Sequence, residues 1–228
     1  MQQLDNITGI IFDYGGTIDS HGDHWSEVIF DQYQRFAPEV SYERFREAYI
    51  YGERALARER IILPCDNFQI LLRKKLAIQA SQLGISEDVA TKIADGCYES
   101  ARQAVADVRP YLERLAERYP LVLVSNFYGN IDEVTRDFGI RHLFRGIVES
   151  AVIGIRKPDP RIFKVGCVVL DMEPEHVLVV GDSVSKDLLP AESLGCATAY
   201  IAGRPWRGDP PSPRPATTIQ SLVTQLGI

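Results

Sequence analysis

The sequence predicts an α/β protein in which helices cover both faces of a parallel sheet and an all-helical insert interrupts the chain. After Asp107, apolar runs of strand length alternate with amphipathic helical segments, which is typical of a parallel sheet buried on both faces. Between His24 and Val105 the apolar residues recur at helical spacing instead. One apolar run precedes that stretch, so the sheet is expected to begin before the insert and to resume after it.

Five apolar runs are expected to be the main strands of the sheet. They read GIIFD, PLVLVSN, GIVES, HVLVVGD and CATAYI, and they cover residues 9–13, 120–126, 146–150, 176–182 and 196–201. A segment of helical periodicity precedes each of the last four runs, over residues 110–119, 131–139, 159–170 and 187–195. A tail with Pro205, Pro210, Pro211, Pro213 and Pro215 is expected to be a surface loop that leads to a last short strand and helix.

Four helices are expected in the insert, over residues 24–37, 41–60, 66–84 and 86–105. Ser41 and Ser86 stand where N-caps of the second and fourth helices are expected. The predicted division is therefore a core of residues 1–20 and 106–228 and an all-helical domain of residues 21–105.

Composition favours a small-molecule partner. The 228 residues, 45% of them hydrophobic, suffice for one core with an inserted smaller domain, and the net charge of −6 gives no basis for binding nucleic acid or an anionic membrane. The chain has no leader-like start and no apolar run of about 18 residues, so a cytoplasmic protein is expected. The four cysteines form no C-x-x-C pair and are expected to be reduced thiols. The sequence predicts no oligomeric state.

Polar residues stand at the ends of four of the expected strands or just beyond them. In chain order they are Asp13, Ser125 with Asn126, Lys157 in RKPDP, and Asp182 with Asp187 in GDSVSKD. Taken singly, each is explained equally well as a helix cap or a solvated charge. Ligands of open parallel sheets bind outside the carboxyl ends of the strands, however, so the set predicts one site.

The order of these residues resembles the haloacid dehalogenase superfamily over nearly the whole chain. The first motif of that superfamily, D-x-D-G-T, is matched by DYGGT at residues 13–17, and the second by Ser125. Lys157 matches the third motif and GDSVSKD the fourth, G-D-x-x-x-x-D. The helical insert lies where the superfamily has its all-helical cap. The resemblance implies a Rossmann-like core with a four-helix cap, and a hydrolase of the phosphatase-like branch.

In such a phosphatase, Asp13 would be the nucleophile and would form an aspartyl-phosphate. A Mg²⁺ ion would relieve the repulsion between neighbouring carboxylates, with Asp13, the Gly15 carbonyl, Asp182 and Asp187 as its ligands. Lys157 would also hold Asp13 ionised. The phosphate of a small phosphorylated substrate would be bound by Gly16, Thr17, Ser125, Asn126 and Lys157.

Gly15 departs from the pattern of the resembled family. There, the residue two beyond the nucleophile offers its carbonyl to the metal and, when it is Asp, a proton to the leaving group. Glycine keeps only the carbonyl, and the missing acid catalysis is worth roughly 10² to 10⁴ in rate. The enzyme would be slow, or specialised for leaving groups that depart without a proton, or supplied with a proton by Asp19, His21 or His24.

Two other functions remain open on the sequence. A regulatory protein could bind a phosphorylated ligand without turnover. A phosphonatase-type enzyme, which resembles this motif with Ala at position 15, would cleave a carbon–phosphorus bond with the help of a cap lysine. Lys74, Lys75 and Lys92 lie in the expected cap, but the stretch LLRKKLA is typical of a solvated helix face. Dehalogenation is disfavoured because the metal-type fourth motif is complete.

Overall fold

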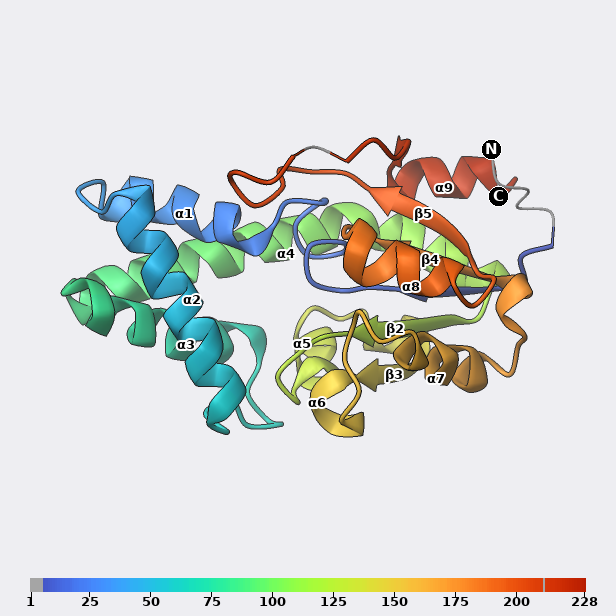
Figure 1. The fold of residues 1–228 in the computed structure, drawn as a ribbon, viewed down its shortest axis with the longest axis horizontal. Helices are drawn as coiled ribbons and strands as arrows, with labels where there is room; N and C mark the ends of the chain where they lie inside the picture. The colour runs from blue at the N-terminus through green and yellow to red at the C-terminus, as the bar shows by residue number, and fades with distance from the viewer. Residues whose placement is uncertain (1–5, 211) are drawn as a thin grey trace.

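The structure is a computed structural model that describes residues 6–210 and 212–228. An α/β core and a helical cap lie next to each other along the long axis of the molecule (Figure 1). This arrangement confirms the predicted fold class. The features predicted for residues 1–5 and for Pro211 lie outside the described residues.

The described residues form one parallel sheet of six strands, in the order β3-β2-β1-β4-β5-β6. The strands are β1 (Gly9–Phe12), β2 (Leu121–Ser125), β3 (Phe144–Glu149), β4 (Val177–Gly181), β5 (Ala197–Ile201) and β6 (Ala216–Thr217). The three central strands, β1, β2 and β4, are buried along their whole length. Because all strands are parallel, their carboxyl ends meet at one edge of the sheet.

Helices cover both faces of the sheet. They are the C-terminal half of α4 (Glu87–Arg118), α5 (Ile131–Asp137), α7 (Arg161–Leu170), α8 (Leu189–Glu192) and α9 (Ile219–Gln225), with the short α6 (Ser150–Ile153), η1 (Arg141–Leu143) and η2 (Pro174–His176) between them. Ile10 and Phe12 pack in the apolar cluster that includes α4, α5 and α9. Ile11 packs in a second cluster with α7 and α8. This alternation has the period of a strand, and burial on both faces explains the uninterrupted apolar runs of the sequence.

The cap has an aromatic interior. It consists of α1 (Trp25–Phe36), α2 (Tyr42–Arg58), α3 (Phe68–Leu83) and the N-terminal half of α4. The ring of Phe45 lies 5.1 Å from the ring of Phe30 and 5.2 Å from that of Tyr33, measured between centroids. Ser41 and Ser86 are the N-caps of α2 and α4, as predicted, and each side chain accepts a backbone N–H of the first turn.

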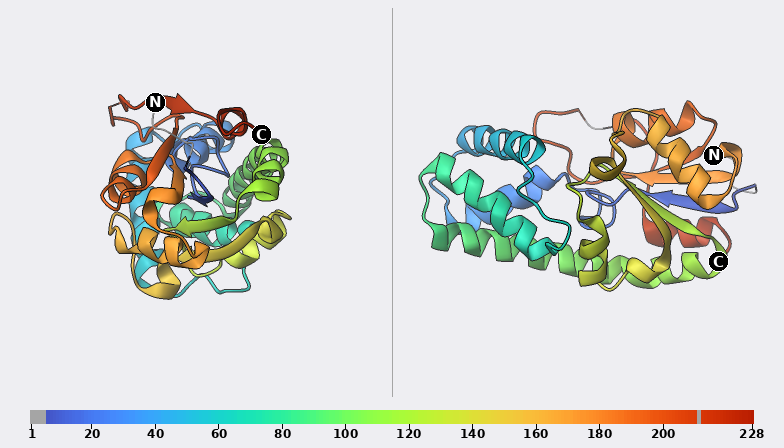
Figure 2. Two further views of the ribbon diagram at one scale, coloured as in Figure 1. Left: turned by 90° about the vertical axis from the view of Figure 1, so that its right-hand side faces the viewer. Right: turned by 90° about the horizontal axis from the view of Figure 1, so that it is seen from below.

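Helix α4 joins the cap to the core. Two helices are predicted over residues 86–105 and 110–119, but the structure has a single helix of 32 residues that runs along both lobes (Figure 2, right). The predicted break at Pro110 is wrong. Pro110 has no N–H to donate to the carbonyl of Ala106, four residues earlier. Both residues are exposed, so water can donate a hydrogen bond to that carbonyl instead. The predicted division of core and cap between residues 105 and 106 falls inside this helix and stays a prediction.

The segment predicted as one helix over residues 187–195 is divided in the structure. A turn of π-helix, η3 (Val184–Leu188), precedes α8, which ends at Glu192. Pro190 lies in the first turn of α8, where a missing N–H costs little. Asp187 consequently lies within η3, directly beside the end of β4.

The proline-rich segment after β5 reaches from the core to the cap (Figure 1). It covers residues 202–215 and is called the β5–β6 loop below. Arg204 forms ion pairs with Asp23 and with Asp31 of α1, at 2.7 Å each. Gly22 and Gly203 approach so closely that a Cβ on either would meet the other's backbone within 2.7 Å. The predicted surface loop is therefore packed against the cap.

The predictions about membranes and thiols can also be compared with the structure. Within the described residues, no helix is long and apolar enough to cross a membrane. Cys97, Cys167 and Cys196 are buried free thiols, and Cys65 is an exposed one. The cytoplasmic location stays a prediction.

Candidate active site

The residues that the sequence assigns to strand ends meet at one edge of the sheet. Asp13 directly follows β1, Ser125 ends β2 and Asp182 directly follows β4. All three line a cavity of about 760 Å³ whose walls come from both the core and the cap. The same cavity is also lined by Gly15, Gly16, Asn126, Lys157 and Asp187.

Lys157 lies between two carboxylates. Its Nζ is 2.5 Å from Asp13 Oδ1 and 2.6 Å from Asp187 Oδ1, and all three side chains are buried. Burial by itself would lower the pKa of Lys157, but Asp13 and Asp187 outweigh burial and hold the pKa above its usual value. Lys157 is therefore a permanent ammonium at the centre of the site.

Two hydroxyl groups complete the surroundings of Asp13. Thr17 Oγ1 lies 3.1 Å from Asp13 Oδ2 and 3.2 Å from Asp182 Oδ1, so it can donate to either carboxylate. Ser125 Oγ donates to Asp13 Oδ1 at 3.4 Å. Asp13 is thus surrounded by donors that would serve equally well for the oxygens of a phosphate.

Three carboxylates form an acidic cluster. One oxygen from each of Asp13, Asp182 and Asp187 lies within 4.8 Å of the other two. Burial, followed by Asp13 and Asp187, raises the pKa of Asp182 well above its usual value; burial raises the pKa of Asp187 to about 6, although Lys157 opposes this. Lys157 therefore does not suffice to hold all three carboxylates ionised. A cluster of oxygen donors with excess negative charge fits a hard divalent cation such as Mg²⁺.

Asn126 holds the loop that carries Lys157. Its Nδ2 donates to the Lys157 carbonyl at 3.0 Å, and its Oδ1 accepts the Lys157 backbone N–H at 2.8 Å. The side-chain amide is therefore engaged with backbone at both ends. Asn126 positions Lys157, and its direct contact with phosphate stays a prediction.

The two glycines that follow Asp13 and Tyr14 differ in what a side chain would meet. Gly16 has a φ of +96°, and a Cβ there would lie 2.5 Å from a carboxylate oxygen of Asp182. Its amide donates to Asp19 Oδ1 at 2.8 Å, so the predicted phosphate donor at Gly16 is engaged within the loop. At Gly15, by contrast, no described atom within 4 Å would meet a Cβ. The structure has room for a side chain at position 15.

His24 is the one predicted substitute acid among the described residues that line the cavity. It is the N-cap of α1, and its side chain accepts the Ser26 N–H. Burial, with Lys186 and Lys75, lowers the pKa of His24 to about 4. The imidazole is therefore neutral at neutral pH and carries no extra proton to give to a leaving group.

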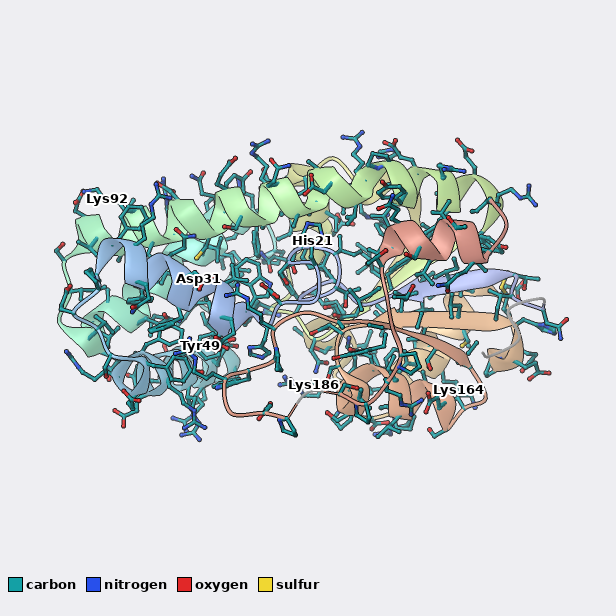
Figure 3. All side chains as sticks on the ribbon, turned by 90° about the horizontal axis from the view of Figure 1, so that it is seen from above. His21, Asp31, Tyr49, Lys92, Lys164 and Lys186 are labelled. Carbon is teal, nitrogen blue, oxygen red and sulfur yellow. The ribbon has the colours of Figure 1, made fainter. Side chains whose placement is uncertain are left out.

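The other two predicted acids are held away from the cavity. Asp19 is buried, accepts the Gly16 N–H, and accepts from Trp25 Nε1 at 3.0 Å; burial raises the pKa of Asp19 to about 7. His21 is exposed, and its Nε2 lies 3.3 Å from Asp107 Oδ2 on α4 (Figure 3). Within the described part of the chain, the lining residues of the cavity include neither Asp19 nor His21.

The cap adds a buried lysine that the sequence prediction places in solvent. Lys75 of α3 is 5% exposed, lines the cavity and forms an ion pair with Glu53 of α2. The prediction of a solvated face is therefore wrong for Lys75. Lys92 is exposed, at the end of the cap away from the core (Figure 3). Lys75 follows Leu71 and Leu72 at helical spacing, and this shared stripe is the sequence signal that could have identified it.

The β5–β6 loop adds an aromatic wall. The ring of Trp206 lies 4.9 Å from the ring of His24 and 5.2 Å from that of Tyr49, measured between centroids, and all three residues line the cavity. The sequence indicates only a proline-rich segment here. Its placement over the cap depends on backbone hydrogen bonds of Arg204 and Arg207 to residues about 180 positions earlier, for which the local sequence gives no signal.

With the fold and site described, the chain can be placed among known proteins. The family model described as haloacid dehalogenase-like hydrolase matches residues 7–195. The chain belongs to this family.

Sequence similarity extends to curated phosphatases over part of their length. A glyceraldehyde 3-phosphate phosphatase of Methanopyrus kandleri is 40% identical over 63 residues, which are 28% of this chain and 27% of that protein. A phosphoglycolate phosphatase of Haemophilus influenzae is 36% identical over 97 residues, 42% of this chain and 43% of that protein. The chain thus spans less than half the length of these relatives.

Among solved structures, a dehalogenase has a TM-score of 0.65 at 19% identity and covers 98% of this chain and 99% of its own. At this level of identity the likeness establishes the fold. The proteins to which this chain is similar are thus named both as phosphatases and as a dehalogenase, and the residues of the site must decide between these functions.

Proposed function

We propose that this protein is a Mg²⁺-dependent phosphatase that hydrolyses small phosphorylated compounds through an aspartyl-phosphate at Asp13. The observation that carries the proposal is the contact of Lys157 with both Asp13 and Asp187, beside Asp182, in one cavity under the cap. In this proposal, residues 21–105 serve as the cap over a core of residues 1–20 and 106–228. Two partly matching curated relatives are named as phosphatases, which supports the same class.

Asp13 would attack the phosphorus atom in line with the leaving oxygen, and the phosphorus–oxygen bond would break as the bond to the carboxylate forms. Lys157, Thr17 and Ser125, which now surround Asp13, would move their hydrogen bonds to the phosphoryl oxygens. Water would then hydrolyse the aspartyl-phosphate and release inorganic phosphate.

Asp13, Asp182, Asp187 and the Gly15 carbonyl would hold Mg²⁺. When bound, the ion supplies positive charge that keeps the carboxylates ionised and offsets the charge of the phosphoryl group. Asp187 also holds Lys157 in place through their 2.6 Å contact.

The leaving group receives no proton from position 15. His24 is neutral, and neither Asp19 nor His21 is among the described residues that line the cavity. Rates should therefore depend steeply on the leaving group, with phenolic and other acidic alcohols favoured. A Cβ at position 15 would meet no described atom within 4 Å, so an aspartate can be introduced there, and we expect it to restore acid catalysis.

A phosphonatase-type reaction ranks lower. It requires a neutral lysine amine that condenses with a carbonyl. Lys75 lies in the cavity, but Glu53 outweighs the effect of burial and holds the pKa of Lys75 above its usual value. A regulatory protein that binds phosphate without turnover ranks below an enzyme, because the nucleophile, the acidic cluster and Lys157 are all present and in contact.

Phosphate release from 4-nitrophenyl phosphate and from glucose 6-phosphate, with and without Mg²⁺, tests the proposal. We expect wild type to hydrolyse the aryl ester only with Mg²⁺, Asp13→Asn to be inactive, and Gly15→Asp to extend activity to glucose 6-phosphate. Asp88→Asn, an exposed aspartate of the cap, is the matched control and should behave as wild type. Absence of metal-dependent turnover in wild type, with gain only in Gly15→Asp, would favour the regulatory protein.

A further inference from the structure

The cap side of the cavity is built around a second ion pair, between the buried Lys75 and the partly exposed Glu53. Lys75 pairs with Glu53, and the Tyr128 hydroxyl donates to Glu53 Oε2 at 2.9 Å. Lys75 Nζ also donates to the Tyr128 oxygen at 3.5 Å and lies 5.0 Å from the centre of the Tyr49 ring. All four residues line the same cavity as Asp13. Because Tyr128 follows Ser125 by three residues, this network extends from the cap to the end of β2.

Both members of this pair are charged, and their charges cancel. Burial would lower the pKa of Lys75, but Glu53 raises it above the usual value; burial would raise the pKa of Glu53, but Lys75 lowers it. The ammonium is therefore already neutralised. A second anionic group of a substrate would have to approach the Glu53 carboxylate in a poorly solvated site, which is unfavourable.

The other cations that line the cavity do not change this balance. Arg204 is paired with Asp23 and Asp31, and Arg214 with Glu192. Arg156 and Lys186 are exposed, and each adjoins a residue of the phosphate site, Lys157 or Asp187. Lys186 belongs to the core side of the molecule (Figure 3). The charge of Lys186 also reaches His24, whose ring packs against Trp206, but both Arg156 and Lys186 are exposed, so water screens their effect on a ligand.

Trp206 offers a hydrogen-bond donor that nothing in the described residues uses. Its Nε1–H is buried and has no partner there. A buried donor without a partner is costly, and Trp206 lines the cavity, so a small shift of the ring on ligand binding would let an oxygen atom of the ligand satisfy it. The loop that carries the ring is held by the ion pairs of Arg204 and by the backbone N–H of Arg207, which donates to Glu27 Oε1 at 3.1 Å.

From these contacts we infer that Glu53, Lys75, Tyr128 and Trp206 form a subsite for an uncharged leaving group that carries hydroxyls. The preferred ligands are monophosphates of small polyols and sugars, and esters with a second phosphate or a carboxylate are rejected. A hydroxyl can accept from Trp206 or Lys75 and donate to Glu53, whereas a carboxylate can only accept. The inference rests on the proposed function, since it assumes that the phosphate binds beside Asp13.

Binding of a matched pair of ligands tests the subsite. Glycerol 3-phosphate and 3-phosphoglycerate share a three-carbon skeleton and differ in whether the far end is a hydroxymethyl group or a carboxylate. Both tryptophans of the chain, Trp25 and Trp206, line the cavity, so intrinsic fluorescence reports occupancy. The titrations use Asp13→Asn with saturating Mg²⁺, so that no ligand is consumed, and include inorganic phosphate as a ligand without a leaving group.

We expect glycerol 3-phosphate to bind at least about tenfold more tightly than 3-phosphoglycerate, because like charges in a buried site repel strongly. Adding Glu53→Gln should abolish or invert this preference, since the unpaired ammonium of Lys75 then attracts the carboxylate. Glu47→Gln is the matched control, because Glu47 is exposed on the same helix, and it should leave the ratio unchanged.

Trp206→Phe provides an independent variant that keeps the ring and removes the N–H. We expect it to weaken glycerol 3-phosphate binding about fivefold and to leave inorganic phosphate unaffected, with Trp25 as the remaining reporter. Equal or tighter binding of 3-phosphoglycerate overturns the subsite, and so does an affinity ratio of the two esters that Glu53→Gln does not alter. In either case the proposed function stands if inorganic phosphate binds. Failure of all three ligands to bind overturns both.

Discussion

The two ends of the cavity both place a buried lysine against carboxylates, but they differ in charge balance. At the core end, Lys157 faces Asp13 and Asp187 with Asp182 close by, so one ammonium is set against three carboxylates. At the cap end, Lys75 faces Glu53 alone. The excess of negative charge fits a divalent cation at the core end, whereas the neutral pair suits an uncharged group. Lysine and carboxylate side chains occur at both ends, and we infer that their balance suits the core end to an ion and the cap end to hydroxyls.

Removing each lysine in turn should give the largest difference between the two ends of the cavity. Lys157→Met leaves two buried carboxylates without their partner and should lower the free energy of unfolding of metal-free protein by about 3 to 5 kcal/mol. Lys75→Met should cost less, because the Glu53 side chain that it leaves unpaired is 33% exposed. Mg²⁺ should stabilise Lys157→Met more than wild type, because the ion replaces the lost charge. For Lys75→Met the gain from Mg²⁺ should equal that of wild type. Urea unfolding with and without Mg²⁺ measures all of these differences.

Lys92→Met is the control for both variants, since an exposed substitution should change stability by about 0.5 kcal/mol or less. Equal gains from Mg²⁺ in Lys157→Met and Lys75→Met would contradict the assignment of the ion to the core end.

Asp19 is not paired with a lysine among the described residues, whereas Glu53 is, so the two carboxyl groups should titrate in different pH ranges. Burial raises the pKa of Asp19 from 3.8 to about 7, whereas Lys75 lowers the pKa of Glu53. Folded protein therefore keeps the Asp19 proton over a range in which the unfolded chain has lost it. Stability falls as pH rises from about 4 to about 7 and is constant above that range. The loss is about 4 kcal/mol at most.

Asp19→Asn should remove this slope. We expect the difference in unfolding free energy between wild type and Asp19→Asn to shift in favour of the variant as pH increases from 5 to 8, measured by urea unfolding at each pH. A difference independent of pH would show that Asp19 is already ionised in the folded protein at pH 5.

Two phosphates of the same sugar can test the core end of the cavity separately from the cap end. Glucose 1-phosphate and glucose 6-phosphate present the same uncharged hexose to the cap, but the anomeric hydroxyl is the more acidic leaving group. Without an acid at position 15, we expect glucose 1-phosphate to be hydrolysed about 10 to 100 times faster. Gly15→Asp should narrow this ratio, as measured by initial rates of phosphate release. A ratio near one in wild type would mean that another group supplies the proton.

Much of the fold and of the core end of the site could be predicted from the sequence. Apolar runs alternating with helical segments predicted the sheet, because burial on both faces leaves no polar position in a central strand. Asp13, Ser125 and Asp182 were assigned to one edge because parallel strands share an edge at their carboxyl ends. The sequence does not predict that α4 continues through Pro110, because the exposure of Pro110 depends on how the helix packs rather than on the residue itself.

The cap end was decided by tertiary structure. Helical spacing places Lys75 on the apolar stripe of Leu71 and Leu72, but only α2 and the loop after β2 bring Glu53 and Tyr128 to its ammonium. Trp206 reaches the cavity through ion pairs between the β5–β6 loop and α1. The sequence by itself determined the residues at the core end of the cavity, because adjacent strands bring those residues together through regular geometry. Only the packing of the cap decided which residues face them, because burial and charge pairing are properties of neighbours distant in the chain.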